Sequence, residues 1–211
     1  MKRQLFIICA LVATVFAVRS AEAVEFSAGE LAKLEAGRTL KKPLSNSRVN
    51  GFYGGTGWTL IDAPADVVWE AIQDWGSYPK AFPKTVSVKE VARRGDRSLL
   101  RMEQGHQLLR IAYHIEVERN PAKHMISFKL AADRPHDIDD TRGYWRLFPQ
   151  ADGRTLVAYV VAVQVPMGII NFVGATLEEK IERNLLGIPE YLKKWLAGPG
   201  AGRYGRTLAS R

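Results

Sequence analysis

The 211-residue sequence predicts an α+β fold, in which a curved antiparallel sheet of seven strands wraps around a long C-terminal helix and two short helices follow the first strand. Three observations lead to this prediction. With 46% hydrophobic and 25% charged residues, the composition is that of a globular protein. Strand-like segments follow one another between residues 84 and 165 with only short turn signals between them, which favours an antiparallel meander. After Gly168 the apolar residues recur at helical spacing instead.

Residues 1–23 are predicted to be an export signal that precedes the fold. Lys2 and Arg3 form a positive n-region, residues 5–18 are uncharged and apolar, and Ala21-Glu22-Ala23 has the pattern of a cleavage site. The alternative is an uncleaved membrane anchor, for which the apolar run is short.

Cleavage after Ala23 would start the mature chain at Val24 and place the protein in the periplasm or outside the cell. It would also remove Cys9, which is the single cysteine of the sequence. We therefore expect neither thiol chemistry nor a structural zinc site built on several thiolates.

Residues 24–50 are predicted to form an N-terminal helix and a linker. Ser27 and Glu30 have the spacing of a capping box, which begins a helix of two or three turns that ends near Gly37. Residues 41–57 are rich in Pro, Ser, Asn and Gly, so we expect irregular chain there. The glycine-rich GFYGGTG within them is not a phosphate-binding loop, because it lacks a Gly-Lys-Ser/Thr ending and no helix follows it.

Residues 51–197 form the main domain, which opens with a strand over 56–61 and two short helices. Asp62 is the expected N-cap of the first helix, and Gly76 is expected to end it. Residues 77–83 form a second, one-turn element between prolines.

Six further strands follow at near-regular spacing. Each ends at turn-forming residues such as Arg94-Gly95-Asp96, Asn120-Pro121 or Asp152-Gly153. The predicted ranges are 84–91, 98–104, 108–118, 124–131, 141–148 and 154–165.

The last element is predicted to be an amphipathic helix of about 25 residues. Its apolar stripe consists of Phe172, Val173, Leu177, Ile181, Leu185, Ile188, Leu192 and Leu196. Pro189 should kink this helix near Leu185, because the proline ring displaces one backbone hydrogen bond.

The tail, residues 198–211, is glycine-rich and is expected to be disordered. It holds Arg203, Arg206 and Arg211 and no acidic residue, within a chain of net charge +8. Nucleic-acid binders concentrate positive charge on a folded face, so we expect no nucleic-acid partner. A transient contact of a monomer with anionic membrane surfaces is one expected use of the charge, and solubility is the other.

The polar residues form no recognisable catalytic or metal-binding set. The sequence has four histidines, His106, His114, His124 and His136, and no two of them have the spacing of neighbours on a helix. The acidic segment after His136 lacks the pattern of a calcium loop. Gln104, Tyr113, His124 and Tyr159 are the polar candidates for inward-facing positions, without a nucleophile, base and orienting group among them. We expect neither a metal nor a cofactor, and we expect these groups to satisfy one another or water.

Strand alternation predicts which side chains face the interior of the sheet. The inward set is Ile111, Tyr113, Ile115 and Val117; His124, Ile126, Phe128 and Leu130; Gly143, Trp145 and Leu147; and Val157, Tyr159, Val161 and Val163.

Residues 60–196 resemble the START-like (SRPBCC) superfamily, also called the helix-grip or polyketide cyclase/dehydrase and lipid transport group. The matching segments are 62–69 (DAPADVVW), 74–79 (DWGSYP), 143–147 (GYWRL) and 187–189 (GIP), and Leu34-Glu35-Ala36-Gly37 is similar to secreted members. The resemblance implies a helix-grip fold that holds an apolar ligand between sheet and C-terminal helix. The residues expected to line that cavity are Gln104, Ile111, Tyr113, Ile126, Phe128, Trp145, Tyr159, Phe172, Leu177, Ile181 and Leu185.

Three functions are compatible with such an interior. The preferred one is an exported carrier or binding protein for a hydrophobic small molecule or lipid. The alternative is a cofactor-independent polyketide cyclase/dehydratase-like enzyme in which tyrosine or histidine moves protons in the same pocket. A third is a partner-binding protein whose core is filled.

Overall fold

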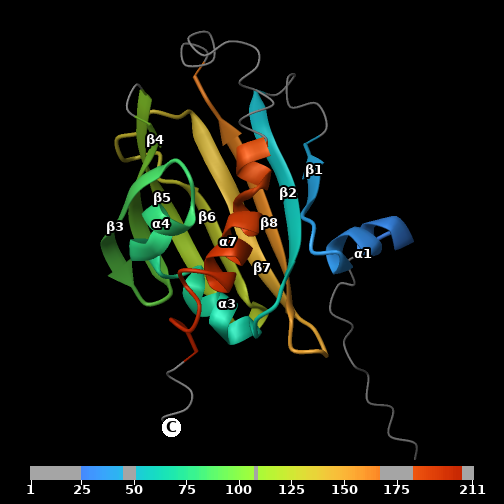
Figure 1. Cartoon of the computed structure of the whole chain (residues 1–211). Helices are drawn as coiled ribbons and strands as arrows, with labels where there is room; N and C mark the ends of the chain where they lie inside the picture. Colours follow the sequence, from blue (N-terminus) through green and yellow to red (C-terminus); the bar gives the residue numbers. More distant parts are fainter. Residues whose placement is uncertain (1–24, 45–50, 107–108, 167–182, 206–211) are drawn as a thin grey trace, which may run out of the picture.

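A single eight-stranded antiparallel sheet dominates the computed structural model, which describes residues 25–44, 51–106, 109–166 and 183–205 (Figure 1). The strand order is β1-β2-β8-β7-β6-β5-β4-β3, so β1 and β3 are the two edges. The strands are β1 (Leu40–Pro43), β2 (Phe52–Ile61), β3 (Thr85–Arg94), β4 (Arg97–His106), β5 (Leu109–Asn120), β6 (Met125–Leu130), β7 (Asp140–Pro149) and β8 (Thr155–Gln164). The helices α3 (Ala65–Ala71), α4 (Tyr78–Ala81) and α7 (Ile188–Ala197) lie on one face of the sheet, whereas α1 (Ala28–Glu35) lies beside the edge formed by β1 and β2. Short 3-10 turns are at Trp75–Ser77 and Pro121–Lys123.

The α+β class and the antiparallel meander are confirmed, but the sheet has one strand more than the seven predicted. Residues 41–57 were expected to be irregular, whereas β1 and the first half of β2 run through them. Gly54 and Gly55 adopt φ of +138° and +142°, and a Cβ on Gly55 would stand 2.1 Å from the Lys42 carbonyl oxygen. The glycines therefore let three backbones approach closely at this point, which is why a glycine-rich segment forms a strand here.

The capping box of α1 is confirmed. The Ser27 hydroxyl accepts from the Glu30 N–H at 3.3 Å, and the Ser27 N–H donates to the Glu30 carboxylate at 2.9 Å. Lys42 lies 2.7 Å from the same carboxylate, and these bonds lower the pKa of Glu30 to about 2. The helix ends at Glu35, and Gly37 follows with φ of +76°.

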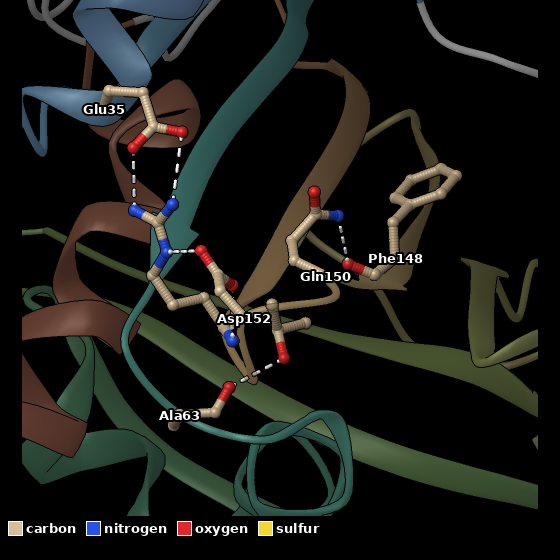
Figure 2. Close-up of polar contacts among 7 residues, drawn as sticks. Glu35, Ala63, Phe148, Gln150 and Asp152 are labelled. Atoms are coloured by element: carbon tan, nitrogen blue, oxygen red, sulfur yellow. Dashed lines mark hydrogen bonds and ion pairs between the residues drawn. The ribbon is translucent and has the colours of Figure 1, made fainter.

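An ion-pair cluster fastens α1 to the turn between β7 and β8 (Figure 2). The Arg154 guanidinium donates to both oxygens of Glu35, at 2.8 and 3.2 Å, and to Asp152 at 2.6 Å. Leu34 is buried beside this cluster on the same helix. The N-terminal helix is therefore packed against the main domain, with Leu34 supplying the apolar contact and Arg154 fixing the orientation.

The helix after β2 begins later and ends earlier than predicted. Pro64, not Asp62, is the N-cap residue of α3, and its carbonyl accepts from the Val68 N–H at 3.1 Å. Residue 62 belongs to the bend that leaves β2, two residues too early to cap the helix. The helix ends at Ala71, so Gly76 lies instead within the 3-10 turn that leads into α4.

The C-terminal helix was predicted to be interrupted near Leu185. The structure confirms an interruption and places it at Gly187. Residues 183–186 are helical, Gly187 interrupts them, and α7 then runs to Ala197. The Gly187 N–H is shared between the carbonyls of residues 183 and 184, and Pro189 has no N–H to continue the pattern. The predicted first half of this helix, with Phe172, Leu177 and Ile181, lies outside the described residues.

The helix α7 lies across the inner face of the sheet and approaches β2 very closely at Gly57 (Figure 1). A Cβ at this position would stand 2.6 Å from the Leu186 carbonyl oxygen and 3.3 Å from the Pro189 ring. Only a residue without a side chain allows this contact between helix backbone and strand.

The tail was expected to be disordered throughout, but residues 198–205 dock on the fold. The Tyr204 hydroxyl donates to Asp74 and accepts from the Trp195 indole N–H, both at 3.0 Å. Arg203 lies 3.0 Å from Asp74, and the Gly205 N–H donates to Glu70 at 2.9 Å. These contacts tie the end of α7 to the loop after α3, while residues 206–211 lie outside the described part. No helix of the described residues is long and apolar enough to cross a membrane.

Candidate functional site

The strand register brings the predicted interior residues into rows on the face that α7 covers. Ile126, Trp145 and Tyr159 are directly paired neighbours on β6, β7 and β8, and the row continues to Gly57 on β2. The pairing order is thus Ile126, Trp145, Tyr159 and Gly57, which places two large aromatic rings beside the position where α7 comes closest.

The next row is built around a missing side chain. Phe128 on β6 pairs with Gly143 on β7, which pairs with Val161 on β8. A Cβ on Gly143 would stand 2.6 Å from the tip of the Phe128 ring. The ring therefore lies over the glycine and turns toward Tyr159, at 6.1 Å between ring centroids.

Five aromatic rings form a continuous series that we call the aromatic ladder: Tyr78, Phe82, Trp145, Tyr159 and Phe128. Successive ring centroids are 4.6, 6.4, 4.4 and 6.1 Å apart. The ladder runs from α4 to the middle of the sheet. Rings at these separations pack favourably and present a stiff apolar surface with few rotamers to fix.

Two phenol groups bring polarity into this apolar interior. Burial raises the pKa of Tyr113 and of Tyr159 well above the usual value, and the nearby Tyr113 raises that of Tyr159 further. Neither hydroxyl hydrogen-bonds to another described residue, whereas the Tyr78 hydroxyl donates to the Ile72 carbonyl at 2.7 Å. At neutral pH both phenols are therefore protonated donors within the apolar cluster, and neither can act as a base.

The structure brings six of the predicted pocket residues into one apolar cluster: Tyr113, Ile126, Phe128, Trp145, Tyr159 and Leu185. Gln104 and Ile111 are paired with each other on the same face of β4 and β5, but they are half-buried and lie outside that cluster.

The inward prediction for His124 is wrong. This residue precedes β6, ends the 3-10 turn at Pro121–Lys123 and adopts φ of +45°, so it lies outside the alternation of the strand. Its ring stands edge-on to Trp69 of α3, at 6.2 Å between centroids. The Asn120-Pro121 turn signal was correct, and the strand begins one residue later than assigned.

One charged residue of the interior was missed. Arg119 continues the inward alternation of β5, is only 6% exposed, and places its guanidinium 5.6 Å from the Trp75 ring. It donates to the Ser98 hydroxyl at 2.9 Å and lies 3.6 Å from Glu90. The alternation of β5 already predicts that the side chain of residue 119 faces inward. The positive charge of Arg119 is the reason why this inward position was not assigned.

The remaining polar residues serve the structure of the strand connections. His114 and His136 use Nδ1 to contact the carbonyls of Pro135 and Ile138, and Asp137 accepts from the Ala112 N–H at 2.8 Å. In the part of the chain that the structure describes, no group of three or more His, Cys, Asp or Glu residues could hold a metal ion.

Comparisons with known proteins agree with this geometry. The sequence pattern of the family described as polyketide cyclase/dehydrase and lipid transport matches residues 61–187, which is more than half of the chain. A curated relative, the granaticin polyketide synthase bifunctional cyclase/dehydratase of Streptomyces violaceoruber, is 28% identical over 130 residues. This match covers 59% of the present chain and 38% of the relative, so the chain spans well under half of that protein.

Two solved structures share the fold. The Zhui aromatase/cyclase from Streptomyces sp. R1128 superposes with a TM-score of 0.57 at 18% identity, covering 72% of this chain and 99% of that one. A STAR-related lipid transfer protein from Xanthomonas axonopodis gives 0.55 at 12% identity, covering 74% and 98%. One neighbour is named as an aromatase/cyclase and the other as a lipid transfer protein.

Proposed function

Because the chain belongs to the polyketide cyclase/dehydrase and lipid transport family, we propose that it binds one hydrophobic small molecule or lipid between the inner face of the sheet and the C-terminal helix. The observation that carries this proposal is the aromatic ladder, which forms a continuous apolar face, together with the two phenols, Tyr113 and Tyr159, that belong to the same apolar cluster. A ligand oxygen that lies against this face would accept a hydrogen bond from either phenol.

The chemistry of the face defines the kind of ligand. Trp145, Tyr159 and Phe128 offer flat apolar area, which favours burial of an apolar body at about 25 cal/mol per Å². Two protonated phenols offer donors and no negative charge, so the polar end of the ligand should carry an acceptor such as a carbonyl or hydroxyl oxygen.

A cyclase/dehydratase-like enzyme is the second candidate, supported by the 28% identical relative. In that case Tyr113 or Tyr159 would donate a proton or a hydrogen bond to a developing oxyanion. Among the described residues, no carboxylate or imidazole is in hydrogen-bond contact with either phenol, so these residues offer no acid–base pair. For this reason we favour the carrier.

Leu185→Trp tests the proposal. Leu185 is half-buried against the apolar cluster, just before the Gly187 break. In a space reserved for a ligand, the indole would occupy existing volume, so the midpoint of denaturation should stay near the wild-type value while uptake of a fluorescent apolar probe is lost. In a filled core the same change should cost about 1–3 kcal/mol.

The matched control is Leu31→Trp, at a position that is 48% exposed on α1. It should change neither the midpoint nor the uptake. A strongly lowered midpoint for Leu185→Trp, with no uptake by the wild type either, would mean that the core is solid and would refute the carrier. Turnover of a polyketide-like substrate that Tyr113→Phe abolishes would instead support the enzyme.

We further propose that the carrier is an exported monomer that transiently contacts anionic membrane surfaces. The export pattern of residues 1–23 supports the periplasm or the exterior as its location. N-terminal sequencing of the protein from its host should begin at Val24, and recovery of intact Met1 would contradict export.

A further inference from the structure

A basic groove lies on the outside of the molecule, where the N-terminal segment meets α7. Its volume is about 550 Å³, and it is lined by Gly37, Arg38, Thr39, Lys41, Glu190, Lys193, Lys194 and Ala197. Four of these side chains are cationic and one is acidic. The interior binding face does not contribute to it, so the groove is a separate feature of the surface.

The single carboxylate of the groove is shared between two of the lysines. Glu190 accepts from the Lys194 ammonium at 2.7 Å and lies 3.9 Å from that of Lys41. Arg38 and Lys193 have no carboxylate within ion-pair distance among the described residues. Among the described residues the groove therefore holds four cationic side chains against one carboxylate, whose charge acts on Lys194, Lys41 and Lys193 together.

The position of Lys193 is fixed across the groove. Its ammonium donates to the Gly37 carbonyl at 3.1 Å, which joins α7 to the turn that ends α1. Gly37 adopts φ of +76°, and this turn directs Arg38 and Lys41 onward along the groove. The cations thus come from two elements that are far apart in sequence and are held together by a defined contact.

Helix stabilisation explains only part of this arrangement. Lys194 lies in the last turn of α7, where a cation interacts favourably with the negative end of the helix dipole. Arg38 follows the C-terminus of α1, where the same effect applies, since its N–H donates to the Lys33 carbonyl at 2.9 Å. Lys41 lies in β1 and Lys193 bonds to Gly37, so neither is explained in this way. The excess charge is therefore a property of the groove.

We propose that this groove binds the phosphate group of an anionic phospholipid at a membrane surface. An arginine fork and ammonium groups are the side chains that proteins use for phosphate oxygens. The groove is open, and the Lys194 side chain is 67% exposed, as a flat bilayer surface requires. This inference rests on the proposed function, since a carrier of an apolar molecule must meet a bilayer to load or release it.

The test is co-sedimentation of the full protein with vesicles of phosphatidylcholine, with and without phosphatidylglycerol. Arg38→Gln with Lys193→Gln should weaken binding to the anionic vesicles about 25-fold, at roughly fivefold per cation. The control is Lys89→Gln with Arg94→Gln, which removes the same charge from β3 at the opposite edge of the sheet. The strands β2, β8, β7, β6, β5 and β4 separate the two edges, and the Debye length is only about 8 Å, so binding should change less than about twofold.

Two further results separate the explanations. Inorganic phosphate should displace the protein from anionic vesicles more effectively than chloride at equal ionic strength. The proposal would be overturned if both double variants lost vesicle binding equally, or if both salts displaced the protein equally. Either result would mean that binding depends only on the general attraction between the protein's positive charge and the anionic vesicle. Probe uptake should be unchanged in the groove variant, so failure of the groove and failure of the carrier are seen in different measurements.

Discussion

Replacing Trp145 by alanine is expected to cost about 3–5 kcal/mol of unfolding free energy, the largest effect of any single change in the interior. Trp145 is 5% exposed and stands between Phe82 and Tyr159 in the aromatic ladder. Its removal leaves a cavity that its two neighbours, held by the sheet and by α4, cannot fill. Domains of this size are stable by only about 5–15 kcal/mol, so the variant should unfold at a much lower denaturant concentration.

The control for this change is the preceding residue on the same strand. Tyr144 points to the opposite face of β7 and is 36% exposed, so Tyr144→Ala removes a ring of similar size without opening the interior. Its cost should stay below about 1 kcal/mol. Urea denaturation of both variants measures the difference, and a Trp145→Ala cost as low as that of Tyr144→Ala would contradict the close packing of the ladder.

Replacing Gly57 by alanine is expected to cost about 2–3 kcal/mol, although it adds a single methyl group. That methyl would stand 2.6 Å from the Leu186 carbonyl oxygen, so α7 must move away from β2. The shift would also displace Leu185 from the interior, and probe uptake should fall together with the melting temperature.

Gly76→Ala is the matched control for this second change. Its Cβ would meet a side-chain oxygen of Asp74 at 3.6 Å, an ordinary contact, and its φ lies in the region that alanine adopts readily. The control should be close to neutral. If Gly57→Ala were equally neutral, the close approach of helix and strand would not be a constraint on the fold.

The sequence allowed the inner face of the sheet to be predicted well, because strand alternation is a strict rule. Ile126, Trp145 and Tyr159 were assigned inward from period alone, and the register pairs them directly. The same rule would have placed Arg119 inward, but no sequence pattern shows that Ser98 and Glu90 lie beside it. Contacts of this kind depend on which strands become neighbours.

The wrong predictions concern segments whose amino-acid composition is typical of a loop or a disordered tail, but whose conformation is set by tertiary contacts. Glycines at 54, 55 and 57 resemble a loop in sequence, yet they mark backbones that pack closely in β2. The tail resembles a disordered segment, yet one tyrosine, Tyr204, bonds to Asp74 and Trp195 and holds it. In both cases a residue far away in the sequence determines the conformation. The conformational propensities of the segment itself contain no information about that distant contact.

The open sheet has a consequence for solubility. A sheet with two free edges could pair with other copies and aggregate. At one edge, β3 exposes Lys89, Arg93 and Arg94 and has two irregularities in register, between Thr85 and Ser87 and between Glu90 and Ala92. At the other edge, β1 has only four residues, two of them lysines, and ends in Pro43. Both borders therefore oppose the addition of a strand from another copy, through charge, brevity and broken register, although the sheet is not closed into a barrel.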